Sequence, residues 1–135
     1  MSVVDLRVPD DQLDYDEDLV YTYRGERFTG IGYDEAPGHS RSEISYVNGV
    51  QEGPARDWYP SGRLKFEAMY KDNARHGHRR EFREDGTISL EEIYEYGVLV
   101  RSASFDVEGR VLQNFEISED SANFNLLRRL RERFG

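Results

Sequence analysis

Histidine and carboxylate side chains are the groups in this sequence that could hold a metal ion or move a proton. The motif "HGH" places His76 and His78 at positions i and i+2, which share one face of a strand, as two metal ligands would. A protein zinc site needs three or four converging ligands, and beyond the isolated His39 the sequence has no cysteine and no second histidine cluster. We therefore expect a solvated hairpin turn at "HGH", with no metal and no cofactor.

Adjacent carboxylates are common, as in the pairs Glu84-Asp85 and Glu91-Glu92. A general acid needs a pKa that burial has raised, whereas these pairs lie beside turn sequences in a polar chain. The chain has no phosphate-binding loop, no dinucleotide fingerprint and no Ser-His-Asp arrangement, and the glycines of "GERFTGIG" lack a strand–turn–helix context. The prediction is that the protein is not an enzyme.

A period of 24 residues organises the middle of the chain. Tyr46, Tyr70 and Tyr94 are spaced by this interval. Two full copies are defined by further pairs at the same spacing, which are Gly53 and Gly77, Trp58 and Phe82, Gly62 and Gly86, and Leu64 and Ile88.

Partial copies flank these two. A third copy begins at Tyr94, and Arg101 takes the place of its second glycine. An upstream copy begins at Tyr23, and four of its later positions align with the repeat, namely Gly25, Gly30, Gly38 and Glu43. The sequence therefore holds about three and a half to four units.

Each unit has the pattern of a β-hairpin. Apolar residues alternate with polar ones after the "PSG" turn, at Leu64, Phe66 and Ala68, which predicts a strand with these side chains on one face. In the next unit Ile93 falls out of this alternation. "VNG" supplies the Asn-Gly pair of tight hairpins, and "YPSG" and "REDG" end in the glycine that a left-handed turn position favours.

These units predict a single domain over residues 1–135, because the chain is too short for two ordinary domains. One hairpin cannot bury its own face, so neighbouring units must continue into one sheet. We predict a mainly β fold in which meandering antiparallel β-hairpin repeats form an extended twisted sheet, followed by a C-terminal α-helix. An acidic N-terminal segment then covers 1–22, the repeats cover 23–117 and the amphipathic helix covers 118–135.

Both ends of the chain are expected to cap the sheet. Ser121 is a suitable N-cap for a helix whose apolar residues fall near one face, at Phe124, Leu127, Leu130 and Phe134. At the N-terminus, a short edge strand is predicted from Val3, Val4, Leu6 and Val8. The stretch "PDDQLDYDED" that follows is expected to be an exposed acidic loop or a partly ordered arm.

The hairpin motifs "YVNGVQEG" and "YKDNARHG" are each followed by an aromatic residue, a turn that ends in glycine, and a strand of the form apolar-x-apolar-Glu. This pattern resembles the MORN-variant repeat, and more closely the YwqK-type antitoxins of bacterial toxin–antitoxin systems, over roughly residues 23 to 117. The resemblance implies a meandering β-sheet protein, encoded beside a toxin, that neutralises the toxin by direct binding. Asn73 and Arg101 depart from the pattern, because the family has glycine at these positions.

The net charge is −9, from 27 acidic and 18 basic residues. This charge disfavours binding to nucleic acid or to an anionic membrane, and it favours a basic protein partner, which under the resemblance is a cognate protein toxin such as a nuclease domain. No apolar run approaches the ~20 residues of a membrane span, and the first residues are acidic where a secretion signal would be basic. We expect a cytoplasmic protein, and the sequence leaves its oligomeric state open.

Exposed tyrosines among acids are typical of a protein-binding surface. The stretch 10–18 carries Leu13 and Tyr15 among its acids, so it could attract a basic patch and anchor in it, although a solubilising tail explains it equally well. Strand alternation places Tyr59 and Tyr96 away from the repeat's main aromatic layer. The candidate partner-binding residues are Asp14, Tyr15, Asp16, Glu17, Asp18, Tyr59, Glu84, Asp85 and Tyr96.

Other repeat positions are expected to be structural. Trp58 and Phe82 are predicted to form the aromatic core of the sheet, because stacked repeats need such a layer. Glu67 and Glu91 occupy the same phase of adjacent units, so we expect them to line up on one face and to pair with Lys65 or with arginines.

The alternative function is a MORN-like structural scaffold, or a membrane or protein interaction module, that lies on lipid head groups or on a partner helix. It requires a basic face, which the C-terminal arginines and the stretch "RHGHRREFR" could supply. Glu81, Glu84 and Asp85 dilute that stretch, and the net charge argues against this alternative.

Overall fold

The computed structural model of the protein describes residues 6–35 and 40–135. Four residues for which the sequence made predictions, Val3, Val4, Gly38 and His39, lie outside these ranges. Within the described residues the elements are β1 (Arg7–Pro9), the 3-10 helix η1 (Asp10–Gln12), β2 (Asp14–Tyr15), β3 (Tyr21–Tyr23), β4 (Glu26–Arg27), β5 (Gly30–Asp34), β6 (Arg41–Val47), β7 (Val50–Trp58), β8 (Leu64–Lys71), β9 (Ala74–Phe82), β10 (Ile88–Glu95), β11 (Val98–Phe105), β12 (Val111–Glu116) and α1 (Ala122–Phe134).

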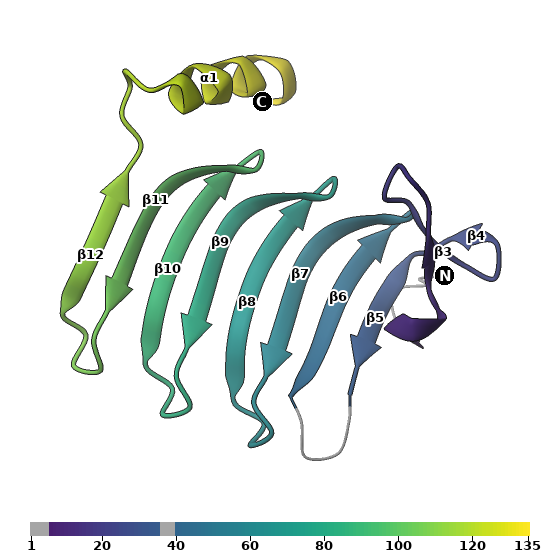
Figure 1. The fold of residues 1–135 in the computed structure, drawn as a ribbon. Helices are drawn as coiled ribbons and strands as arrows, with labels where there is room; N and C mark the ends of the chain where they lie inside the picture. Colours follow the sequence, from purple (N-terminus) through teal and green to yellow (C-terminus); the bar gives the residue numbers. More distant parts are fainter. Residues whose placement is uncertain (1–5, 36–39) are drawn as a thin grey trace.

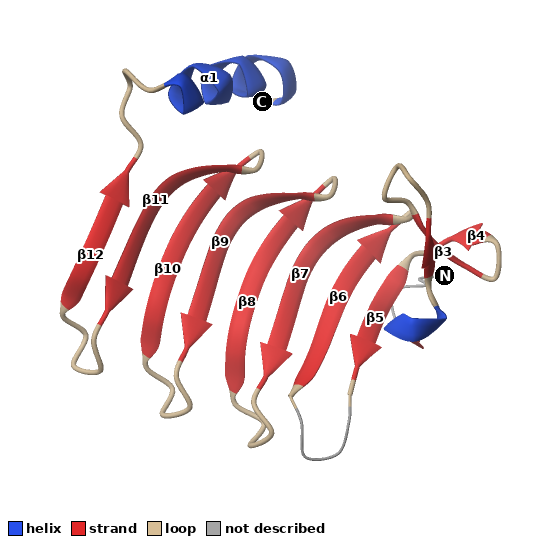
Figure 2. Ribbon diagram, viewed as in Figure 1, coloured by secondary structure: helices blue, strands red, loops and turns tan. Residues whose placement is uncertain are grey.

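Nine of these strands form one open sheet in the order β1-β5-β6-β7-β8-β9-β10-β11-β12 (Figure 1). From β5 to β12 each strand is antiparallel to the one before it, so this part of the sheet is an uninterrupted meander of hairpins. Strand β1 joins β5 in parallel, which makes the whole sheet mixed, and β2, β3 and β4 form a separate small sheet. The mainly β fold with a C-terminal helix is thereby confirmed (Figure 2).

The hairpin turns between β6 and β7, β8 and β9, and β10 and β11 form one rim of the sheet, which we call the upper rim after its place in Figure 1. Their central residues all have positive φ, which is the type I′ geometry that matches the twist of paired strands. The values are 51° and 87° at Asn48 and Gly49, 50° and 68° at Asp72 and Asn73, and 50° and 83° at Tyr96 and Gly97. The tight turn predicted from "VNG" is therefore confirmed.

Among the described residues, the hairpin turns of β7–β8, β9–β10 and β11–β12 form the lower rim. Each ends in a glycine with φ near 90° whose N–H donates a hydrogen bond to the carbonyl three residues earlier. These glycines are Gly62, Gly86 and Gly109. The predicted glycine turns are confirmed, and the two rims together explain the 24-residue period as one turn of each kind for every unit.

Register shifts next to the lower rim decide which face each side chain takes. Asp57 lies opposite Phe66, whereas the next residue, Trp58, lies opposite Leu64, so Lys65 is an extra residue in β8. Because Asp57 and Trp58 alternate, Leu64 faces away from Phe66, and the predicted common face of the three apolar residues of this strand is wrong. An equivalent shift lies between Ile88 and Leu90 in the next unit, so Leu90 faces away from Ile88.

A compact hydrophobic cluster lies at the N-terminal end of the sheet. Its buried members are Val8, Phe28 and Tyr46. Partly buried side chains of β3 and of the residue that follows η1 pack against them. The upper-rim turn also docks here, because the Tyr21 N–H donates to the carbonyl of Gly49 at 2.7 Å. The acidic N-terminal stretch is therefore an ordered part of the fold, and the upstream repeat is divided between the small and the large sheet.

Elsewhere the sheet is a single layer with both faces partly open to solvent. Trp58 and Phe82, predicted as core, are half-buried, and the guanidinium of Arg41 lies 4.2 Å from the ring centroid of Trp58. The repeats thus stack through paired strands and half-buried side chains and not through a closed aromatic core.

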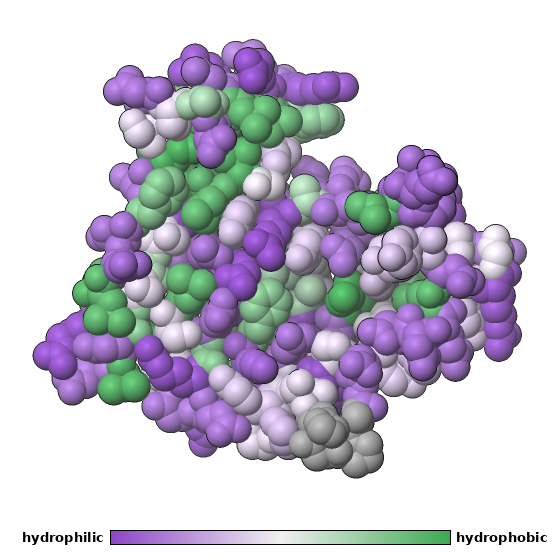
Figure 3. Space-filling model, in the orientation of Figure 1, coloured by the Kyte–Doolittle hydropathy of each residue, from purple (hydrophilic) through white to green (hydrophobic). Residues whose placement is uncertain are grey.

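Helix α1 begins as predicted, because the Ser121 hydroxyl accepts a hydrogen bond from the Phe124 N–H at 3.1 Å. Leu127 is completely buried, whereas Phe134 at the far end is 57% exposed. Figure 3 shows apolar surface between the helix and the strands beneath it. No helix in the described ranges is both long and apolar enough to cross a membrane.

Candidate protein-interaction surface

Residues Asp14 to Asp18, which we call the acidic turn, lie at the N-terminal end of the molecule and are all exposed. The carboxylate of Asp16 holds the turn by accepting hydrogen bonds from the N–H groups of Asp18 and Val20 at 2.9 and 3.0 Å. Tyr15 is 65% exposed, and its ring lies 5.4 Å from that of Tyr21. The turn therefore presents carboxylates and one aromatic ring on a fixed backbone.

The acidic turn carries uncompensated charge. Asp14, Asp16, Glu17 and Asp18 form no ion pair with any residue of the described chain. Close by, partial burial and the carboxylates of neighbouring aspartates raise the pKa of Asp10. A local excess of negative charge thus surrounds this end of the sheet.

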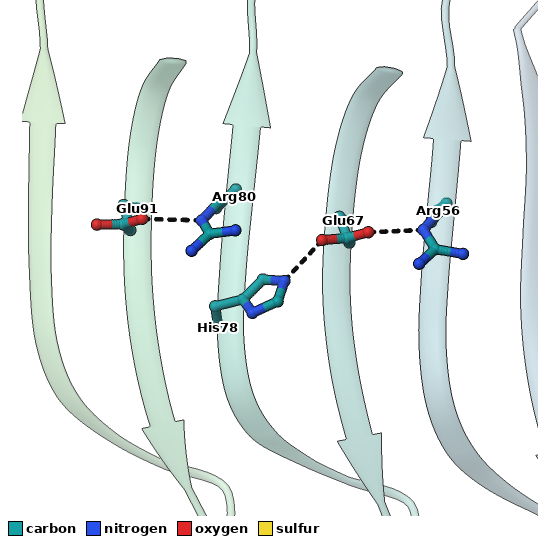
Figure 4. A network of polar contacts seen from close by, with 5 residues as sticks. All are labelled: Arg56, Glu67, His78, Arg80 and Glu91. Carbon is teal, nitrogen blue, oxygen red and sulfur yellow. Dashed lines mark hydrogen bonds and ion pairs between the residues drawn. The ribbon is translucent and has the colours of Figure 1, made fainter.

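One row of charges that crosses the sheet is matched in sign. Five residues stand opposite one another on five successive strands and alternate in sign, a row that we call the charge ladder: Glu43, Arg56, Glu67, Arg80 and Glu91. Arg56 donates to Glu67 at 2.6 Å and Arg80 donates to Glu91 at 2.8 Å (Figure 4). The prediction that Glu67 and Glu91 share a face and pair with arginines is confirmed, whereas Lys65 instead lies over the ring of Tyr59.

Glu67 is the most enclosed acid of the charge ladder, because His78 on β9 also donates to it, at 2.6 Å. Burial alone would raise the pKa of Glu67, but the hydrogen bonds from Arg56 and His78 outweigh it and lower the pKa below its ordinary value. The carboxylate is therefore held ionised by two neighbouring strands.

The face opposite the charge ladder has its own ion pairs. Arg79 contacts Glu81 and Glu92, each at 2.8 Å. Arg75 lies over the ring of Tyr94 and donates to its hydroxyl. The arginines of "RHGHRREFR" are thus divided between two faces, and each meets an acceptor or an aromatic ring.

Three of the candidate residues, Tyr59, Glu84 and Asp85, lie together at the lower rim. The Tyr59 hydroxyl donates to the carbonyl of Phe82 at 2.6 Å, so this ring is half-buried and does not stand free. Asp85 accepts from the N–H and the hydroxyl of Thr87, and these hydrogen bonds lower its pKa. These residues lie at the rim opposite the one that touches the acidic turn.

Tyr96 lies at the upper rim beneath α1. Its ring is 4.6 Å from that of His76 and 5.9 Å from that of Phe134, and its N–H donates to His76 Nδ1 at 2.9 Å. The same rim reaches Leu19, the residue that follows the acidic turn, because the Asn73 side chain donates to its carbonyl. Tyr96 therefore shares a rim with the acidic turn but is half-buried, contrary to the expectation of an open face.

The prediction of a solvated hairpin turn at "HGH" is wrong, because these residues lie within β9 and are half-buried. Both histidines are occupied by protein contacts, His76 by the backbone of Tyr96 and His78 by Glu67. The described residues contain no group of three or more His, Cys, Asp or Glu side chains placed to hold a metal ion.

Sequence reasoning missed two features of this surface. Arg131 of α1 forms a bidentate pair with Glu95, at 2.8 and 2.7 Å, which ties the helix to β10. Strand β12 ends the sheet with all six residues exposed, among them Val111, Leu112 and Phe115. The sequence signal that could have predicted this edge was the position of "VLQNFE" as the last strand pattern before the helix.

In comparisons with known proteins, no family model matches the chain, and no curated protein matches it. Among solved structures, part of a chain in "Crystal structure of accessory secretory protein 1,2 and 3 in Streptococcus pneumoniae" is similar at 12% identity and a TM-score of 0.38. The match covers 88% of this chain and 21% of that chain. A likeness at this level assigns neither a fold family nor a function.

Proposed function

We propose that this protein binds a basic protein partner through the acidic turn and acts as an antitoxin or immunity protein that neutralises a toxin. The observation that carries the proposal is the set of unpaired carboxylates on an ordered, exposed turn that also presents Tyr15. A nuclease domain is a suitable target, because a surface that holds phosphate groups is basic and carboxylates can occupy the same positions.

The distribution of charge supports this choice of surface. The acids of the charge ladder are neutralised by arginines, so they add little to the field far from the sheet. The first 20 residues hold seven acids and one arginine. In the described chain no arginine forms an ion pair with a carboxylate of the acidic turn. Association with a basic domain would therefore be steered toward this end of the molecule, and its rate would fall as salt rises.

The geometry of the turn favours affinity as well as steering. Asp16 fixes the backbone through two hydrogen bonds, so less conformational entropy is lost on binding than for a free acidic tail. Tyr15 adds a large contact area with few rotatable bonds. Both properties distinguish this turn from a segment that only improves solubility.

The test is to express each reading frame adjacent to the gene alone in bacteria, to identify a toxic product, and to co-express it with this protein. Rescue of growth together with a stable complex on co-purification is the expected result. Absence of a toxic neighbour and of any complex would remove the antitoxin proposal.

Two variants with the same charge change locate the surface. D14N/E17Q/D18N removes three charges from the acidic turn and leaves Asp16 in place, whereas E84Q/D85N/E132Q removes three charges elsewhere. We expect the first variant to weaken the complex at least about tenfold and to slow association, and the second to change it little. The reverse order would remove binding from the acidic turn, and equal effects would leave only a general role for net charge.

A further inference from the structure

We propose that β12 is a self-complementary edge, through which two copies of this chain join their sheets into one continuous antiparallel sheet. The proposal concerns the free protein and is independent of the toxin, so its outcome does not depend on that of the proposed function.

The two edges of the nine-stranded sheet differ in their capacity to pair. Strand β1 has three residues, one of which is Pro9, and proline lacks the N–H that a further strand would need. Strand β12 has six residues with no proline and no lysine, and three of them are large exposed apolar residues: Val111 at 55%, Leu112 at 63% and Phe115 at 45%. Long edges with exposed apolar residues and without proline or lysine are those that pair with another strand.

Figure 1 shows β12 at one end of the sheet, with α1 extending back over the upper rim toward β9 and away from the open side of β12. The apolar colouring at that end of the surface in Figure 3 agrees with the exposed residues. In the described structure, therefore, the helix leaves the open edge of β12 accessible.

One hydrogen bond fixes which main-chain groups of β12 face outward. The Ile117 N–H donates to the carbonyl of Val100 on β11 at 2.8 Å. Main-chain groups alternate in direction along an antiparallel strand, so Phe115 bonds toward β11, while the N–H and C=O groups of Asn114 and Glu116 point to the open side. A partner strand must bond to these two residues.

A two-fold axis at Phe115 satisfies all these groups at once. Asn114 then pairs with Glu116 of the second copy and Glu116 pairs with its Asn114, which gives four main-chain hydrogen bonds. The two Phe115 residues face each other as a close pair without hydrogen bonds, where cross-strand aromatic contact is strongest. On the other face the Asn114 amide can donate to the Glu116 carboxylate of the second copy.

The repulsion between two chains of charge −9 is weak at this distance from the acidic end, because 0.15 M salt screens charges beyond about 8 Å. Among the described residues β12 is the one edge of the sheet suited to pairing, so the assembly closes as a dimer.

The contact is confined to one strand, so we expect a reversible dimer that dissociates on dilution through the micromolar range. Sedimentation equilibrium of the free protein at 0.15 M salt tests this directly. A monomer at every concentration up to about 1 mM would overturn the proposal.

Proline at residue 114 removes only the outward N–H, so N114P should leave the sheet folded and weaken the dimer at least about tenfold. N114A keeps that N–H and should dimerise nearly as the wild-type protein does. Circular dichroism establishes that both variants fold. A dimer that survives N114P unchanged would place the interface elsewhere.

Cysteine cross-linking tests the register without relying on proline, and the chain has no cysteine of its own. F115C should form a covalent dimer under a mild thiol oxidant, because the paired Cα atoms lie within disulfide range at the two-fold axis. Q113C lies on the same face of β12 but about 13 Å from its own symmetry mate, so it should not. Equal cross-linking of the two variants, or none of either, would contradict the register.

Discussion

Glu67 accepts hydrogen bonds from two neighbouring strands at once, from Arg56 on β7 and from His78 on β9. Its side chain is 15% exposed, while the equivalent pair of Arg80 and Glu91 is more than a third exposed on both sides. At the scale of single residues, the acids of the charge ladder therefore differ in burial. We expect the enclosed carboxylate of Glu67 to contribute more to stability than that of Glu91.

The lowered pKa of Glu67 predicts a dependence of stability on pH. In the unfolded chain this carboxyl group binds a proton more readily than in the fold, so its contribution is present above the unfolded pKa and is lost as the pH falls through the folded value. Glu67→Gln should lower the free energy of unfolding by about 1–2 kcal/mol at pH 7, and the difference from wild type should shrink toward pH 3.

Urea unfolding at a series of pH values measures this difference. Glu91→Gln is the comparison, because its more exposed pair should contribute less than about 1 kcal/mol at pH 7. Equal losses for the two variants, or a loss for Glu67→Gln that persists at pH 3, would contradict the assignment.

Helix α1 is attached to the sheet by few contacts. Leu127 is its one completely buried residue, and the ion pair of Arg131 with Glu95 is partly exposed. The adjacent Leu126 is 39% exposed. At the scale of elements, docking of the helix thus depends mainly on one side chain.

Leu127→Ala should lower the free energy of unfolding by about 2–4 kcal/mol, or release α1 from the sheet, because it removes the side chain that fills the contact. Leu126→Ala, the same chemical change one residue earlier, should cost less than about 0.5 kcal/mol. Thermal unfolding gives the first quantity, and amide hydrogen exchange in α1 detects release. Similar effects of the two substitutions would mean that the helix is not held through Leu127.

Elements defined by local chemistry could be predicted from the sequence. The glycine and Asn-Gly turns, the apolar period of α1 and its Ser121 cap depend on neighbours within a few residues. The bulge at Lys65 could not be predicted, because it depends on how two strands align. The burial of Tyr96 also could not, because it depends on where α1 lies.

At the scale of the whole molecule, the two terminal segments cover opposite faces at opposite ends of the sheet. Leu13 lies against the backbone of Gly32, on the face of Ile44 and Tyr46, whereas α1 bonds to Glu95 on the charge-ladder face. Between them, each hairpin unit contacts only its neighbours. The period in the sequence predicted this arrangement of units, but the faces chosen by the ends depend on tertiary packing.

A sheet of this kind should accept an additional unit. A second copy of residues 70–93 inserted after Ile93 places Glu91 opposite a new Arg80, which repeats the native contact of Glu67 with Arg80. The sheet should lengthen by two strands, or about 10 Å, as measured by small-angle X-ray scattering. An insert of the same composition in permuted order should not fold into the sheet, and equal dimensions for the two proteins would contradict the prediction.

The single-layer sheet also bears on how this protein can change over evolution. Seven hydrophobic residues of the described chain are buried. Almost all the remaining side chains along the middle of the sheet retain contact with water. Main-chain pairing and the turn residues at the two rims maintain the frame, so most substitutions on the broad faces cost little stability. New partner specificities can therefore arise by successive exchange of surface side chains, while the ends and the turns preserve the fold.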